Sequence, residues 1–271
     1  MNKFSIVSLA TAISMASVSA AHADKLEDVV GDGTLRCAIT LDNGQAGFRD
    51  SQNEPAGFDV DYCKDLAAAL GVKATIIDVP FPDRIPSIIS GRADVAVAST
   101  SPTMERAKSI GFSVPYFAYQ YVVLTRQDTG IKGYEDLKGH TISTPQGNYG
   151  NDFITADLKR WNDSKGSLKS FQNMNDNILA VSQGHSDATV VVNTVAQDAV
   201  KSGKFKGLTI AGAAPWQIDY VSLAVARDEY GFLNYLNLFV NQQTRSGRYT
   251  ELWNKWIGGP VLDPSKSSQL Q

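Results

Sequence analysis

The sequence predicts an α/β protein made of two units, each built on a mainly parallel sheet. Short strand patterns alternate with helical patterns from residue 35 to residue 99, and the same alternation begins again after Gly130 and runs to about residue 211. Strands joined through a helix form parallel pairs, and helices cover the faces of such sheets. Two such runs therefore predict two lobes with a cleft between them, where strand ends and helix N-termini gather.

The first unit has three predicted strands and two predicted helices. Its longer helix opens at Gly57, places Val60, Cys63 and Leu66 on one face, and ends at Gly71, since glycine readily adopts the left-handed conformation of a helix end. The expected elements are strand 35–40, helix 57–70, strand 73–79, helix 84–90 and strand 94–99.

The second unit repeats this order. A β-rich run at 119–125 precedes it, and the loop TPQGNYG at 144–150 separates its first strand from a helix, because glycine and asparagine favour turns. The expected elements are strand 140–143, helix 151–161, strand 167–171, helix 176–184, strand 188–192, helix 194–201 and strand 208–211. A strand at 221–226 and a helical segment at 231–256 complete the chain.

The first 23 residues have the pattern of a cleaved export signal. Lys3 precedes an apolar stretch at 4–18, and Ala21-His22-Ala23 forms a small-residue cleavage site. No later stretch approaches the roughly 20 consecutive apolar residues of a membrane span. The formal charge of −3 gives no basic surface of the kind that binds nucleic acid. We therefore expect an exported, soluble protein without a nucleic-acid partner.

The two cysteines leave two interpretations open. Cys37 lies in the first predicted strand and Cys63 in the helix that follows, and an exported protein reaches a compartment where disulfides form. Buried free thiols also pack well as small apolar groups. Because the sequence gives no distance between the two sulfur atoms, we favour two buried thiols over a disulfide.

A candidate anion-binding segment follows the strand at 94–99. Hydroxyl groups occur at Ser99 and Ser101, Pro102 suits the start of a helix, and Arg106 lies in the helical turn predicted next. Backbone N–H groups at a helix start and a nearby guanidinium attract a carboxylate or a phosphate. The alternative is an ordinary strand–helix junction whose arginine faces water.

Five segments, in order, resemble the periplasmic solute-binding proteins of polar amino-acid ABC transporters. They are GFDVDYCKDLAAALG (57–71), RIPSIISGRADVAVA (84–98), TSPTMERAKSIGFSVPYF (100–117), EDLKGHTISTPQGNYG (135–150) and SGRYTELWNKWIG (246–258). The resemblance implies the two-lobed periplasmic-binding-protein fold, with one lobe at 24–120 plus 222–271, the other at 121–221, and two hinge strands. It also implies a monomer with no metal, cofactor or catalytic residue. Such a protein closes on a small carboxylate ligand and docks on the membrane permease of an ABC importer.

The resemblance also implies roles for particular residues. Arg106 would hold the ligand's α-carboxylate, assisted by Ser99 and Ser101, because a planar guanidinium donates two parallel hydrogen bonds to a carboxylate. Phe81, in the loop after the second strand, is a candidate wall of the site. The second lobe would contribute the loop residues Gly147, Asn148 and Tyr149.

Departures from the family pattern leave the ligand's other end open. Asn43 stands where the family often has an aromatic residue, and Val192 stands where it has an acid that pairs with the ligand's ammonium. A desolvated ammonium without a partner would cost several kcal/mol. Either Asp42 or Asp219 takes this role, or Asn193 is the contact, or the ligand lacks an α-ammonium.

Two other functions could use the same fold. A sensory binding protein would have the same binding chemistry, and the sequence does not separate it from a transport protein. An enzyme resembling cyclohexadienyl dehydratase would need an acid or base in the cleft. His140 and His185, however, are expected at surface turns, and no catalytic motif occurs. We therefore expect a transport-linked binding protein in the periplasm.

Overall fold

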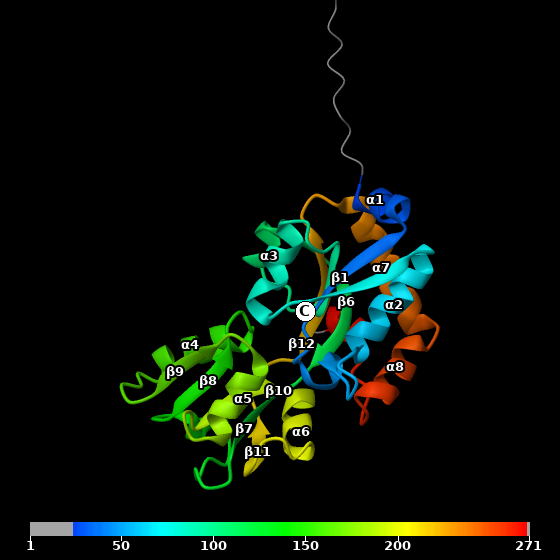
Figure 1. Ribbon diagram of the computed structural model, residues 1–271. Coiled ribbons are helices and arrows are strands. Elements are labelled where there is room, and N and C mark those ends of the chain that lie inside the picture. Colours follow the sequence, from blue (N-terminus) through cyan, green and yellow to red (C-terminus); the bar gives the residue numbers. More distant parts are fainter. Residues whose placement is uncertain (1–23, 270–271) are drawn as a thin grey trace, which may run out of the picture.

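The computed structural model describes residues 24–269 and has two lobes, each with one five-stranded sheet (Figure 1). The signal peptide predicted at residues 1–23 lies outside the described residues. Within the described range, no helix is long and apolar enough to cross a membrane. The two sheets and their flanking helices confirm the predicted two-lobed α/β fold.

The first sheet contains strands from both ends of the chain. Its strand order is β4 (Lys73–Asp78), β1 (Thr34–Ile39), β5 (Val95–Thr100), β12 (Asp219–Ala226) and β6 (Ile110–Tyr119). β1 pairs in parallel with β4 and β5, whereas β12 runs antiparallel to both β5 and β6. The sheet is therefore mixed, with a parallel core at the β1 side.

Helices cover both faces of this sheet, and the alternation along β5 shows why. Val95 and Val97 share an apolar cluster with α2 (Phe58–Leu70), while Ala96 and Ala98 share another with α3 (Arg84–Ile89). On the α2 side lie α7 (Tyr230–Arg245) and α8 (Arg248–Trp256), with α1 (Lys25–Asp32) against α7. Because successive strand residues point to opposite faces, one strand supplies both clusters.

A disulfide joins β1 to α2. The Sγ atoms of Cys37 and Cys63 are 2.09 Å apart, their Cα atoms are 6.4 Å apart, and both side chains are buried. The expectation of two free thiols is therefore wrong. Cys37 points to the face of the sheet that α2 covers, and Cys63 lies on the buried face of α2, which brings the Cα atoms within the range that a disulfide spans.

The second sheet is formed by one continuous stretch of chain. Its strand order is β11 (Leu208–Ala213), β7 (Tyr121–Arg126), β10 (Ala188–Val192), β8 (Thr141–Pro145) and β9 (Ser167–Phe171). β8 pairs in parallel with β10 and β9, and β7 runs antiparallel to β10 and β11. Three helices pack on this sheet: α4 (Gly150–Arg160), α5 (Met174–Ser182) and α6 (Asn193–Lys201).

The chain passes between the two sheets twice. The first passage is Gln120, between β6 and β7, and the second is the segment 214–218, between β11 and β12. At the first sheet the two passages lie side by side, because Tyr119, just before the first passage, pairs with Asp219, just after the second. The lobe boundaries inferred from the family resemblance stay a prediction.

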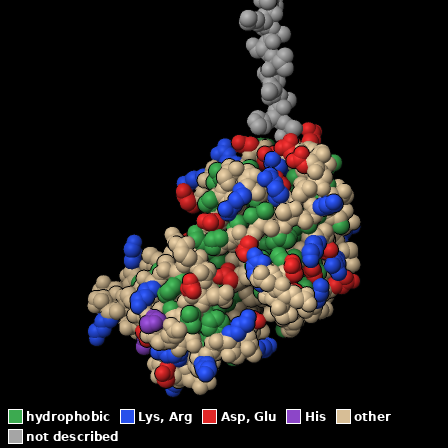
Figure 2. Space-filling view, viewed as in Figure 1, with side chains coloured by type: hydrophobic (Ala, Val, Ile, Leu, Met, Phe, Trp, Pro, Cys, Tyr) green, Lys and Arg blue, Asp and Glu red, His purple; other side chains and the backbone are tan. Residues whose placement is uncertain are grey.

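The two lobes are in contact with each other (Figure 2), and the segment after β1 makes part of that contact. Asp42 Oδ2 accepts a hydrogen bond of 2.6 Å from the backbone N of Met174, and Gln45 Nε2 donates to Asp198 Oδ1 at 2.9 Å. The structure is therefore a closed arrangement of the lobes. Short elements complete the fold: the ribbon of β2 (Phe48–Arg49) and β3 (Pro55–Ala56), and 3-10 turns at Gly44–Ala46, Phe81–Asp83, Arg106–Lys108, Tyr134–Leu137 and Pro264–Gln269.

Candidate functional site

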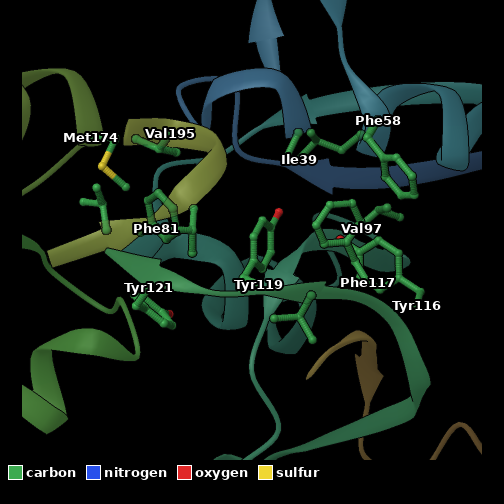
Figure 3. Close-up of a cluster of buried hydrophobic side chains, with 14 of the residues drawn as sticks. Ile39, Phe58, Phe81, Val97, Tyr116, Phe117, Tyr119, Tyr121, Met174 and Val195 are labelled. Atoms are coloured by element: carbon green, nitrogen blue, oxygen red, sulfur yellow. The ribbon is translucent and has the colours of Figure 1, made fainter. Parts of the chain in front are cut away.

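A small cavity with about 260 Å³ of non-atom space lies where the two lobes meet. Residues of both sheets and of the loops that follow their strands line it, and Figure 3 shows three of them, Phe81, Tyr119 and Tyr121, at this junction. The lining consists of Asn43, Phe81, Arg84, Ser99, Ser101, Tyr119, Tyr121, Asn148, Tyr149, Val192 and Asp219. Five of the nine residues predicted for the site therefore line one cavity: Phe81, Ser99, Ser101, Asn148 and Tyr149.

Ser99 has an unusual backbone for a non-glycine residue, with a φ of 51° near the end of β5. Three hydrogen bonds hold it there. Its backbone N donates to the Tyr116 hydroxyl at 3.1 Å, and its Oγ lies 2.7 Å from the Tyr119 hydroxyl and 3.0 Å from Asn43 Nδ2. Such a conformation costs on the order of 1 kcal/mol or more and persists only when its surroundings impose it.

The Tyr116 hydroxyl continues inward to Asp59. It donates to Asp59 Oδ1 at 2.8 Å, and Asp59 lies in the first turn of α2 with only 1% of its surface exposed. Burial raises the pKa of Asp59 to about 8, although the hydrogen bond from Tyr116 and the charge of Arg84 oppose that rise. Through Tyr116, Asp59 supports the cavity wall from behind.

Arg84 is the site residue that the sequence analysis missed. Its Nε donates to Phe81 O at 3.0 Å, and its Nη1 donates to the carbonyl oxygens of Ala98 and Ser99, each at 2.8 Å. Its Nη2 donates across the cleft to Gly147 O at 2.8 Å. Burial lowers its pKa to about 10, so the guanidinium stays charged at neutral pH.

Arg106 reaches the same carbonyl oxygen from the other side. Its Nη1 donates to Ser101 O at 2.9 Å and its Nη2 to Gly147 O at 3.1 Å. It lies in a three-residue 3-10 turn, so the expected helix N-terminus is wrong: the turn is too short to build an α-helical dipole. Among the described residues, no carboxylate forms an ion pair with Arg84 or Arg106. Arg106 borders the cavity without lining it.

The second lobe contributes the turn between β8 and α4. Gly147 has a φ of 75°, and a Cβ there would lie 3.2 Å from Pro82 Cα of the other lobe, so glycine permits the close approach. Asn148 Oδ1 accepts from Gly150 N at 2.8 Å and fixes the start of α4. The ring of Tyr149 packs edge-on against Phe153. The predicted Gly147, Asn148 and Tyr149 therefore all face the first lobe.

Two predicted contacts lie outside the cavity. Asp42 is held by the backbone N of Met174 in the contact between the lobes, and Asn193 begins α6 with its backbone N donating to Gln120 O at 2.8 Å. Neither residue lines this cavity: Asp42 already has a partner in the contact between the lobes, and the lining includes Val192, the neighbour of Asn193. Their roles as ligand contacts stay predictions.

Asp219 lies in the cavity, at the start of β12. Its Oδ2 accepts hydrogen bonds from Ser101 Oγ at 2.8 Å and from the Tyr121 hydroxyl at 3.1 Å. Burial raises its pKa, while these two hydrogen bonds lower it. His140 and His185 do not line the cavity.

Two lobes joined by two passages, with a polar cavity at their junction, define the class of two-lobed solute-binding proteins. The chain belongs to the bacterial extracellular solute-binding proteins, family 3, which it matches over residues 35–259. This confirms the family inferred from the five sequence segments.

Named relatives and solved structures agree with this membership. The glutamine-binding protein GlnH of an ABC transporter of Bacillus subtilis is 27% identical over 239 residues, which is 86% of this chain and 85% of the relative. The structure of an ancestral arginine-binding protein bound to arginine has a TM-score of 0.77 and 30% identity, covering 83% of this chain and 99% of that one. A cyclohexadienyl dehydratase of Pseudomonas aeruginosa is 29% identical over 144 residues, about half of each chain.

Proposed function

We propose that this protein captures a small carboxylate-bearing solute, an amino acid or a close derivative, in the periplasm and delivers it to the permease of an ABC importer. Relatives named for glutamine and arginine binding support an amino acid as the ligand. Because these relatives cover most of the chain, whereas the dehydratase match covers 52% of it, we propose binding without catalysis.

One observation carries this proposal. The guanidinium groups of Arg84 and Arg106, at 2.8 and 3.1 Å, both donate to Gly147 O of the opposite lobe. Two cationic donors that meet at one oxygen suit a carboxylate, because hydrogen bonds from a guanidinium to an anion are stronger than those to a neutral carbonyl. A ligand carboxylate that takes up these donors would join the lobes more strongly than the carbonyl does.

The remaining predicted residues have proposed roles around that carboxylate. Arg106 has donors left over after its two hydrogen bonds, since a guanidinium carries five N–H groups, and it is the side chain free to turn toward a ligand. Ser99 and Ser101 shape the wall beside it, and Phe81 closes one end. Asn148 and Tyr149 cover the ligand from the second lobe when the lobes close.

Arg106→Ala is expected to weaken ligand binding by at least about thirtyfold, since removing one partner of a charged contact costs about 2–5 kcal/mol. A thermal-shift screen with L-amino acids identifies a ligand, and calorimetry measures its affinity for the variant. Arg227→Ala is the matched control, because Arg227 is exposed, does not line the cavity, and contacts only Asp228 and the carbonyl oxygen of Lys108 among the described residues. Equal affinities of the Arg106 variant and the wild type would sink the proposal.

Delivery to a transporter is tested separately from binding. Cells lacking this protein are expected to lose high-affinity uptake of the labelled ligand and to regain it when the wild-type chain is restored. Unchanged uptake together with a lost chemotactic response would favour the sensory alternative. Recovery of a chemically altered compound from the protein would favour an enzyme. The proposed monomeric state is checked separately by light scattering.

A further inference from the structure

The cavity contains one acid, and it belongs to the strand that leads out of the second lobe. Among the described residues that line the cavity, Asp219 is the only carboxylate. Val192, at the end of β10, lines the same cavity with an apolar side chain that is 5% exposed. A positive group on a ligand in this cavity therefore has a single candidate partner.

The hydrogen bonds of Asp219 leave one carboxylate oxygen open. Both bonds that it accepts, from Ser101 Oγ and from the Tyr121 hydroxyl, go to Oδ2. Oδ1 accepts no hydrogen bond from the residues that the structure describes, although Asp219 is only 7% exposed. A carboxylate offers about four lone-pair positions. Asp219 lines the cavity, and a buried carboxylate with an oxygen that accepts no hydrogen bond is suited to bind a donor that enters the cavity.

Two other acids near the junction already accept hydrogen bonds from protein groups outside the cavity. Asp42 lies outside the cavity and accepts from the backbone N of Met174. Asp59 lies behind Tyr116 and is 1% exposed, so no ligand in the cavity reaches it. Neither can neutralise a ligand's positive charge.

Ser101 connects the open acid to the carboxylate-binding arginine. Its backbone O accepts from Arg106 Nη1 at 2.9 Å, and its Oγ donates to Asp219 Oδ2 at 2.8 Å. Arg106 and Asp219 both hydrogen-bond to Ser101, and among the described residues they form no ion pair with each other. These two opposite charges suit the carboxylate and the ammonium that an amino acid carries on one carbon atom.

We propose that Asp219 binds the α-ammonium of the ligand through Oδ1, which makes the protein selective for α-amino acids over carboxylates that lack the amino group. This inference rests on the proposed function and names the ligand class of the same site. The ammonium partner then lies on β12 of the first sheet, beside the arginines, and the second lobe contributes no charged group to the cavity.

The test compares pairs of compounds that differ only in the amino group: L-glutamine with 4-carbamoylbutanoate, and L-arginine with 5-guanidinopentanoate. Calorimetry is run on the wild type, on Asp219→Asn, and on Asp128→Asn, an exposed acid that pairs with Arg126 and serves as the control. For whichever pair binds, the wild type and the control are expected to bind the amino acid at least a hundredfold more tightly than its deamino counterpart. Asp219→Asn is expected to lose that preference while its affinity for the deamino compound changes less than about threefold.

Three outcomes overturn the inference. In the first, the wild type binds both members of a pair equally, a result that needs no variant and holds even if Asp219→Asn fails to fold. In the second, Asp219→Asn weakens both members alike, which indicates a structural role. In the third, the variant keeps the preference. If no amino acid or carboxylate binds the wild type, the proposed function itself fails, so the two failures are distinguishable.

Discussion

The two walls of the cavity present different chemical groups. The first-lobe wall consists of side chains that buried hydrogen bonds hold in place, and it carries both charged residues that line the cavity, Arg84 and Asp219. The second-lobe wall presents a backbone carbonyl at Gly147, the amide of Asn148, the ring of Tyr149 and apolar Val192. The first-lobe wall can bind charged groups of a ligand, and the second-lobe wall can cover the ligand.

This difference suggests that the two walls act at different stages of closure. A ligand shifts the lobes toward the closed form only if it binds that form better than the open form. Charge recognition by the first lobe can begin while the lobes are apart, and the contacts that exist only in the closed form come from the second-lobe turn. The contact of Asp42 with Met174 and that of Gln45 with Asp198 add to the closed form without a ligand.

Removing the buried guanidinium of Arg84 should disrupt the first-lobe wall and have the largest effect on stability. Arg84→Met removes the side-chain hydrogen bonds to the carbonyl oxygens of Phe81, Ala98 and Ser99, and leaves Gly147 O with the bond from Arg106 alone. We expect the free energy of unfolding to fall by about 3–5 kcal/mol, as when a buried charged group is removed from its partners. Urea unfolding followed by circular dichroism measures it.

Arg49→Met is the control for this variant, because Arg49 is 40% exposed and pairs with Asp78 at the surface. Its loss should stay below about 1 kcal/mol. Equal losses in the two variants would mean that Arg84 does not hold the first wall together.

Removing the disulfide should weaken the first lobe selectively. In Cys37→Ala/Cys63→Ala the loop of 26 residues between β1 and α2 is no longer closed in the unfolded chain. We expect a loss of about 2–4 kcal/mol. Hydrogen exchange should show less protection in β1 and α2, with β8 and β9 unchanged. A uniform loss of protection in both lobes would show that they unfold as one unit and would remove the contrast between them.

A methyl group on the second-lobe turn should have the smallest effect and act on closure. Gly147→Ala adds a Cβ at a φ of 75°, 3.2 Å from Pro82 Cα. Gly130→Ala is the matched control, since its φ is 78° and nothing lies within 4 Å of the added Cβ. Both should lose about 1 kcal/mol from backbone strain. Only Gly147→Ala should also weaken ligand binding several-fold in calorimetry, and equal affinities would contradict a contact specific to the closed form.

The sequence predicted the parts of the site that local patterns determine. Ser99 and Ser101 follow a buried strand, and strand ends gather at the cleft of such folds. The turn before α4 consists of Gly147, Asn148 and Tyr149, and glycine and asparagine are typical of such turns. These residues were found because their neighbours in sequence place them.

The remaining parts depend on contacts between distant segments. Arg84 was missed because its partners are carbonyl groups of β5 and of the second lobe, which nothing near it in sequence reveals. The helix expected at Arg106 is a 3-10 turn. The disulfide required the distance between β1 and α2. Asp42 and Asp219 were equivalent candidates until the fold placed only Asp219 in the cavity.

The pairing of β6 with β12 bears on the order in which the chain can fold. These strands are antiparallel neighbours with Tyr119 opposite Asp219, so the second lobe occupies the place of a hairpin loop. β12 is also an inner strand, between β5 and β6, so the first sheet is incomplete until residue 226 is available. Pulsed hydrogen exchange during refolding should therefore detect the second sheet, which spans residues 121–213, before the first, and the reverse order would contradict this expectation. The middle of the chain would then be the part that folds first.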